Sequence, residues 1–90
     1  MKRRPNIFIL MQLLELMIQE PRGPTRLAQA ANLNYRKCEE FLGILSSNQL
    51  VTKEISDGRD TFSATQKGRD IYWRWVKFFE DVKVPGTDLR

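Results

Sequence analysis

Basic side chains are the residues of this sequence with the most binding chemistry to offer. Lysine and arginine number 15 against 11 aspartates and glutamates, which gives a formal net charge of +4 at pH 7. A surplus of positive charge favours a polyanionic partner, although where the charges lie matters more than their sum. Lys2, Arg3 and Arg4 precede Pro5. They form a basic arm over residues 1–5, which either follows phosphates or is disordered.

Side chains suited to catalysis are scarce. The chain has no histidine and a single cysteine, Cys38, so it lacks the commonest general base and the commonest metal ligand. Serine–histidine and cysteine–histidine nucleophile pairs, and the usual zinc sites, cannot be assembled within one chain. The five glycines are scattered and form no phosphate-binding loop. We therefore expect no enzyme, no metal and no cofactor, and we interpret Cys38 as a small core residue.

The length and the apolar pattern predict one small domain inside the cell. Ninety residues leave no room for a second core. The apolar stretch 7–18 resembles a signal peptide, but Gln12 and Glu15 interrupt it. No uninterrupted run approaches the ~20 apolar residues that span a bilayer. We expect a cytoplasmic protein with no membrane partner, a folded domain over residues 6–83 and a flexible tail over residues 84–90.

Three helices are predicted in the first half of the chain. The first covers residues 6–20 and stops at the Pro-Arg-Gly-Pro sequence 21–24. It is apolar over most of its circumference, so it must be covered on more than one side. The second covers 26–31 with Thr25 as N-cap. The third is capped by Asn34 and runs to residue 47, where Asn48 is expected in the left-handed conformation. Its core face carries Cys38, Phe41, Leu42 and Leu45.

A β-hairpin follows, with strands over residues 50–56 and 59–64. Asp57-Gly58 predicts a type I′ turn. This turn fixes the register, which pairs Val51 with Ala64, Lys53 with Phe62, Ile55 with Asp60 and Ser56 with Arg59. Val51, Ile55, Phe62 and Ala64 then share one face, as a half-buried hairpin requires. Because Lys53 and Asp60 fall on the same face, the apolar patch covers the base of the hairpin and the tip is solvated.

A last helix over residues 65–82, capped by Thr65, is too apolar to stand alone in water. One line of its side chains, formed by Ile71, Trp75, Phe78 and Val82, can cover the domain core. An adjacent line can meet a second subunit. The predicted homodimer interface consists of Tyr72, Trp75, Val76, Phe79 and Val82, together with Leu13 of the first helix. Stacking of the aromatic side chains on single-stranded bases is the alternative, but helical spacing favours packing.

The order of these elements is that of a winged helix-turn-helix, in which the exposed hairpin is the wing. The predicted class is mainly α with a β-hairpin (α+β), with a three-helix core, a wing and a C-terminal dimerisation helix. Residues 25–35 resemble the second helix, the turn and the recognition-helix start of archaeal winged-helix proteins. The segment 62–68, Phe-Ser-Ala-Thr-Gln-Lys-Gly, is similar to the start of their last helix. Over residues 7–82 the chain resembles the archaeal ten-kilodalton DNA-binding proteins, which dimerise through that helix. Pro85-Gly86 ends it early, which favours a compact dimer.

The resemblance implies that the helix over residues 34–47 enters the major groove of double-stranded DNA. Arg36 is then placed to bind a guanine edge, Lys37 a phosphate, and Arg59 of the wing the minor groove or a phosphate. Glu40 either pairs with Arg36 or accepts a hydrogen bond from cytosine. The candidate DNA-binding residues are Arg26, Gln29, Asn34, Tyr35, Arg36, Lys37, Lys53 and Arg59.

Two functions follow from this arrangement. The first is a homodimeric double-stranded DNA-binding protein, either a transcriptional regulator or a chromatin-associated factor at the nucleoid. No small-molecule ligand is inferred. The alternative is a winged-helix protein–protein interaction module that does not bind DNA, because fold alone does not decide function. Four acids near the expected DNA-binding face keep this alternative open: Glu39, Glu40, Asp57 and Asp60.

Overall fold

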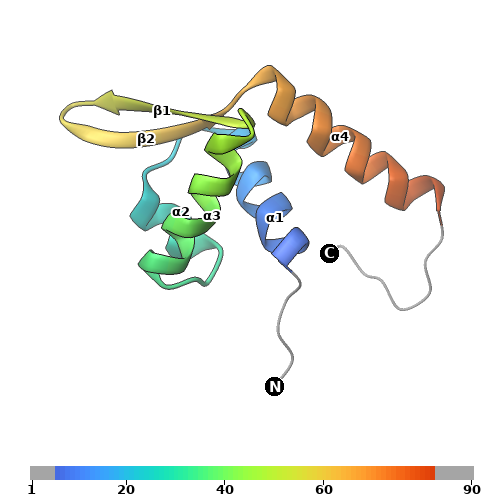
Figure 1. The fold of residues 1–90 in the computed structure, drawn as a ribbon, viewed down its shortest axis with the longest axis horizontal. Helices are drawn as coiled ribbons and strands as arrows, with labels where there is room; N and C mark the ends of the chain where they lie inside the picture. Colours follow the sequence, from blue (N-terminus) through green and yellow to red (C-terminus); the bar gives the residue numbers. More distant parts are fainter. Residues whose placement is uncertain (1–5, 83–90) are drawn as a thin grey trace.

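The computed structural model describes residues 6–82, which form four helices and one hairpin (Figure 1). The elements are α1 (Asn6–Gln19), α2 (Pro24–Ala30), α3 (Tyr35–Ser47), β1 (Val51–Ser56), β2 (Arg59–Ala64) and α4 (Gln66–Asp81). The first three helices pack together, and the hairpin and α4 extend from them on opposite sides (Figure 1). The predicted class is confirmed. The predicted basic arm and tail lie outside the described residues.

The core lies between α1, α2, α3 and the base of the hairpin. Leu13, Leu14 and Cys38 are fully buried in it, so Cys38 is a core residue as predicted. Burial of its thiol raises the Cys38 pKa above the usual value, and the charge of Glu39 adds to that effect. None of the helices within residues 6–82 has the length and apolarity to cross a bilayer.

Two helix starts are as predicted. The Asn34 side chain accepts a hydrogen bond from the Lys37 backbone N–H at 2.8 Å, and the Thr65 hydroxyl accepts one from the Gly68 N–H at 3.0 Å. Each cap satisfies a backbone donor that the helix itself leaves unpaired, which stabilises the helix by about 1 kcal/mol. Thr65 Oγ1 also donates to the Gln49 carbonyl at 2.7 Å. It therefore ties the end of α3 to the start of α4.

The predicted start of α2 is wrong. The helix begins at Pro24 and not at Arg26, and its N-cap is Gly23, which makes no side-chain capping bond. Thr25 therefore lies inside the helix. The physical reason is Pro24, whose fixed φ suits the first helical position and whose missing N–H would have been unpaired there.

The predicted end of α3 at residue 47 is confirmed, but the left-handed residue that follows is Gln49 and not Asn48. Asn48 has φ −96°, whereas Gln49 has φ +60°. The Asn48 side chain donates to the Ile44 carbonyl at 2.8 Å, so Asn48 stays near the helical conformation. The turn to the left-handed region then falls on the next residue. The Gln49 and Leu50 N–H groups close the helix on the Ser46 and Leu45 carbonyls, which is the Schellman arrangement.

The hairpin has the predicted register, from Val51 opposite Ala64 to Ser56 opposite Arg59. Asp57 and Gly58 have φ of +53° and +73°, as a type I′ turn requires. A single β-bridge, which was not predicted, pairs Arg22, before α2, with Phe62 of β2. The Arg22 N–H donates to the Phe62 carbonyl at 3.0 Å and the Phe62 N–H to the Arg22 carbonyl at 2.8 Å. The base of the wing is thus anchored to the chain between α1 and α2.

The side of α4 that covers the core differs from the predicted one. Tyr72 and Trp75 pack against the core, while Phe78 and Val82 are 54% and 42% exposed. The rotation of the helix is set at Gly68, where a Cβ atom would overlap the Leu50 carbonyl and lie 3.2 Å from Leu14 Cδ1. Tyr72 and Trp75 follow Gly68 by four and seven residues, so they lie on the same face of the helix.

Candidate nucleic-acid interface

The first turn of α3 carries three of the candidate contact residues. Tyr35, Arg36 and Lys37 are all exposed, directly after the Asn34 cap. The buried side of the helix consists of Cys38, Phe41, Leu42 and Leu45. Arg36 lies on the opposite side by helical spacing. The fold therefore presents a cationic first turn outward and keeps the apolar face of α3 in the core.

Glu40, one turn further along α3, pairs with Lys37 and not with Arg36. Lys37 Nζ lies 3.5 Å from Glu40 Oε2, and both side chains are more than half exposed. The predicted Arg36–Glu40 pair is not formed, because Glu40 is also within reach of Lys37 at i, i+3 spacing. Within residues 6–82, no carboxylate pairs with Arg36. A surface pair of this kind contributes only about 0–1 kcal/mol, so Lys37 can leave it at little cost.

Tyr35 lies beside the wing, where two carboxylates act on it. The charge of Glu39 raises the Tyr35 pKa above its usual value, and partial desolvation, a hydrogen bond to Glu39 and the charge of Asp60 raise it further. Tyr35 and Glu39 help line a cleft of about 480 Å³ between α3 and the hairpin. On the hairpin side of that cleft, Lys53 Nζ of β1 lies 3.9 Å from Asp60 Oδ2 of β2. Lys53 is therefore the second predicted contact residue that a carboxylate partly neutralises.

A second groove brings together candidate residues from three elements. It has a volume of about 860 Å³ and lies between the start of α2 and strand β2. Arg26 and Gln29 of α2, Tyr35 of α3 and Arg59 of the wing all line it. Among the described residues, neither Arg26 nor Arg59 is in an ion pair. Both arginines are thus available to an anionic partner.

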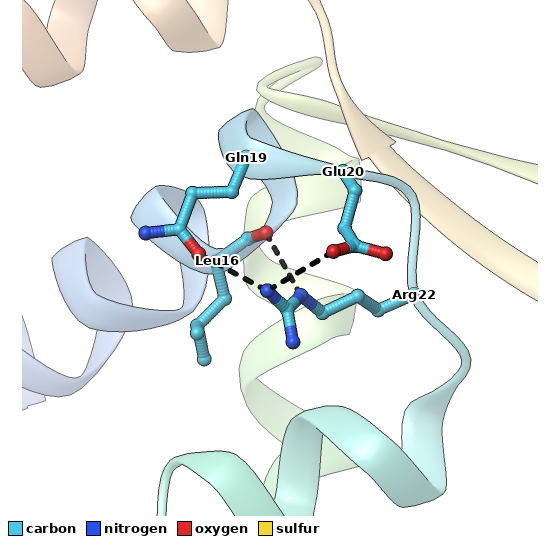
Figure 2. Close-up of polar contacts among 4 residues, drawn as sticks. All are labelled: Leu16, Gln19, Glu20 and Arg22. Carbon is cyan, nitrogen blue, oxygen red and sulfur yellow. Dashed lines mark hydrogen bonds and ion pairs between the residues drawn. The ribbon is translucent and has the colours of Figure 1, made fainter.

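Arg22, at the edge of the candidate interface, was not predicted from the sequence. Its Nε donates to the Leu16 carbonyl at 3.1 Å and its Nη2 to Gln19 Oε1 at 3.0 Å, with Glu20 Oε2 at 3.8 Å (Figure 2). The guanidinium thus caps the C-terminal end of α1, while the Arg22 backbone pairs with the wing. The only sequence signal was an arginine three residues beyond the end of α1. Arg22 also lines the larger groove, so it positions the wall that carries Arg26 and Arg59.

The apolar surface near α4 differs from the predicted dimer interface. Leu13 is 0% exposed and cannot contact a partner, because α1 turns it into the core of its own subunit. Tyr72 and Trp75 are half-buried against α1, where Trp75 meets the Phe8 ring edge-on at 5.7 Å. Burial raises the pKa of Tyr72 to about 12, and its hydrogen bond to Glu15 adds to the shift. The exposed large apolar side chains of α1, α4 and the α4 C-cap are Ile7, Trp73, Phe78 and Val82.

A family model described as winged helix-turn-helix matches residues 3–83. The uncharacterized protein MJ0287 of Methanocaldococcus jannaschii is 24% identical over 78 residues, which cover 87% of this chain and 76% of that protein.

Solved structures have the same fold. Sso10a-2, a DNA-binding protein from Sulfolobus solfataricus, superposes with a TM-score of 0.70 at 22% identity over 87% of this chain and 84% of that one. The transcriptional regulator BldR from the same organism superposes with a TM-score of 0.71 at 17% identity. The match covers 87% of this chain but only 64% of BldR. The homodimeric winged helix-turn-helix DNA-binding domain Mb0332 from Mycobacterium bovis superposes with a TM-score of 0.68 at 22% identity. The match covers 81% of this chain and 68% of that one.

The family match extends over nearly the whole chain, and the order of helices, hairpin and last helix agrees with it. At these identities the structural likeness supports the fold alone. This chain belongs to the winged helix-turn-helix family.

Proposed function

We propose that this chain is a double-stranded DNA-binding protein that acts as a homodimer, either as a transcriptional regulator or as a chromatin-associated factor at the nucleoid in the cytoplasm. The observation that carries the proposal is the exposed first turn of α3, where Arg36 has no carboxylate partner within residues 6–82. A groove lined by Arg26 and Arg59 lies beside it. Similar folds in Sso10a-2 and Mb0332, both described as DNA-binding, support the proposal.

In this proposal α3 lies in the major groove with its first turn towards the base edges. Arg36 donates two hydrogen bonds to a guanine, and Lys37 leaves Glu40 to contact a phosphate. The larger groove receives the sugar-phosphate backbone of one DNA strand, and Arg26 and Gln29 of α2 contact it. Arg59 at the wing tip reaches the minor groove or a phosphate. Much of the affinity then comes from phosphate contacts and falls with salt.

The homodimer is proposed from the apolar side chains that α1 and α4 leave in solvent. Trp73 is 60% exposed, and Ile7, Phe78 and Val82 are exposed with it. A domain of this size buries a smaller share of its surface than a large one, so covering these side chains with a second copy is favourable. The homodimeric state of Mb0332 supports this assembly.

The test is binding to a random-sequence duplex over a salt series. The wild type is compared with an Arg36→Ala/Lys37→Ala variant and with Arg74→Ala/Lys77→Ala, which removes the same charge from exposed positions on α4. We expect micromolar binding by the wild type, and a slope of log K against log salt that is shallower by about 1–2 in the α3 variant. The α4 variant should keep the wild-type slope. Equal losses in both variants would contradict a role for α3.

A protein–protein interaction module is the second candidate. It is favoured by the two ion pairs Lys37–Glu40 and Lys53–Asp60 and by Glu39, which break up the positive surface. If the wild type does not bind the duplex even at low salt, this second function replaces the first.

A further inference from the structure

Gly43 lies in the interior of α3, on the side of the helix that faces away from the core. It follows Arg36 by seven residues and Glu40 by three, and Ser47 follows it by four, so all four share one face. All four positions are exposed. If α3 enters DNA as proposed above, Gly43 is part of the surface that meets the duplex.

The fold does not need a glycine at this position. Glycine is among the poorest residues in a helix interior, because it loses the most backbone freedom on folding. A Cβ atom built on Gly43 would meet no atom within 4 Å, and α3 is helical throughout this stretch. Gly68 is the opposite case, since a Cβ there would overlap the Leu50 carbonyl. Packing within the subunit therefore explains Gly68 and leaves Gly43 without a structural reason.

The missing side chain opens the cleft between α3 and the wing. Gly43 and Ser46 line this cleft of about 480 Å³ on the α3 side, and Thr52 and Lys53 line it on the hairpin side. With no Cβ at Gly43, the wall of the cleft on that side is the helix backbone. A rigid partner can therefore come closer to α3 there than any side chain would allow.

We propose that Gly43 is a point of closest approach between α3 and the DNA duplex, where the helix backbone itself packs against the groove edge. This inference rests on the proposed function. The carboxylates of Glu39 and Asp60 line the same cleft, so a phosphate is disfavoured beside Gly43. The neutral deoxyribose and base edges fit there, while the phosphates lie towards Arg36. Gly43 thus sets how deeply α3 enters the groove.

The test is a glycine-to-alanine substitution whose effects on stability and on binding have opposite signs. Gly43→Ala should raise the Tm by about 2–8 °C, because alanine is the better helix former and meets no atom. It should weaken binding to a duplex by about fivefold or more, and Gly43→Leu should weaken it further. Gln66→Ala, at an exposed position in the first turn of α4 and away from this face, is the control and should change binding little.

Each outcome decides the matter. A Gly43→Ala variant that is more stable and binds more weakly, with Gly43→Leu weaker still, supports the close approach. Wild-type affinity in both Gly43 variants overturns it and leaves the proposed DNA binding intact. An equal loss in Gln66→Ala also overturns it, because the effect would then not be specific to the glycine. A wild type that binds no duplex overturns the proposed function and this inference together.

Discussion

The Tyr72 hydroxyl joins α4 to α1 through its hydrogen bond to Glu15, at the edge of the core. Burial is the larger cause of its raised pKa, and the carboxylate of Glu15 adds to it by favouring the protonated phenol. A raised pKa means that the folded state holds this proton more tightly than the unfolded state does. The contact therefore stabilises the fold only while Tyr72 is protonated.

Stability should fall at alkaline pH through this residue. The Tyr72 pKa rises from 10.0 to about 12 on folding, so its contribution is complete below pH 10 and is lost as the pH rises to 12. We expect Tyr72→Phe to be less stable than the wild type below pH 10, by about 1 kcal/mol for the lost hydrogen bond. The difference should shrink and then reverse as the pH rises from 10 to 12, because the Phe variant has no phenolic proton to lose. Urea unfolding of both proteins across this range measures it, and a constant difference would contradict the assignment.

Single residues at the candidate interface could be predicted only in part. The exposed first turn of α3 follows from local rules, because the Asn34 cap and the apolar face of the helix determine which side chains point outward. The partner of Glu40 could not be predicted, since i, i+3 and i, i+4 contacts differ little in energy. Arg22 was missed because its role depends on Leu16 and Phe62, and spacing does not reveal that they meet.

Among the elements, those with local signals could be predicted from the sequence. The hairpin register follows from Asp57-Gly58, because a two-residue type I′ turn leaves no freedom in the pairing. The rotation of α4 about its axis could not be predicted, because two adjacent apolar lines fit the core equally well by spacing. The choice between them depends on a tertiary contact, in which Gly68 lies against the Leu50 carbonyl and Leu14.

Gly68→Ala tests this account of the docking of α4. The added methyl would overlap a backbone carbonyl that already accepts the Thr65 N–H at 3.0 Å, so the backbone must shift. We expect a loss of about 2–3 kcal/mol in the free energy of unfolding, measured in urea. Gly43→Ala, which removes another glycine from a helix, is the control and should stabilise. A neutral Gly68→Ala would mean that α4 is not held at this point.

At the scale of the whole molecule, α4 packs one face against the core of its own subunit and exposes apolar side chains to solvent. Its Gly68–Trp75 face packs on α1, whereas Trp73, Phe78 and Val82 remain in solvent. In Figure 1 the helix projects from the three-helix body on the side away from the hairpin. A second copy bound along α4 would thus leave α3 and the wing of both subunits uncovered. Such a dimer can offer two recognition helices to one duplex.

Phe78→Asp should separate the two subunits without unfolding either one. Phe78 is 54% exposed, so the subunit tolerates a charge there, whereas a desolvated aspartate in an apolar interface is costly. We expect a dimeric wild type and a monomeric variant by sedimentation equilibrium. Because two linked sites bind with avidity, affinity for a duplex should fall by about 100-fold. Ile55→Asp, at an exposed apolar position of β1, is the control and should stay dimeric, because the hairpin and α4 extend from the three-helix body on opposite sides (Figure 1). A Phe78→Asp protein that remains dimeric would exclude this face of α4, and a monomeric wild type would exclude the homodimer itself.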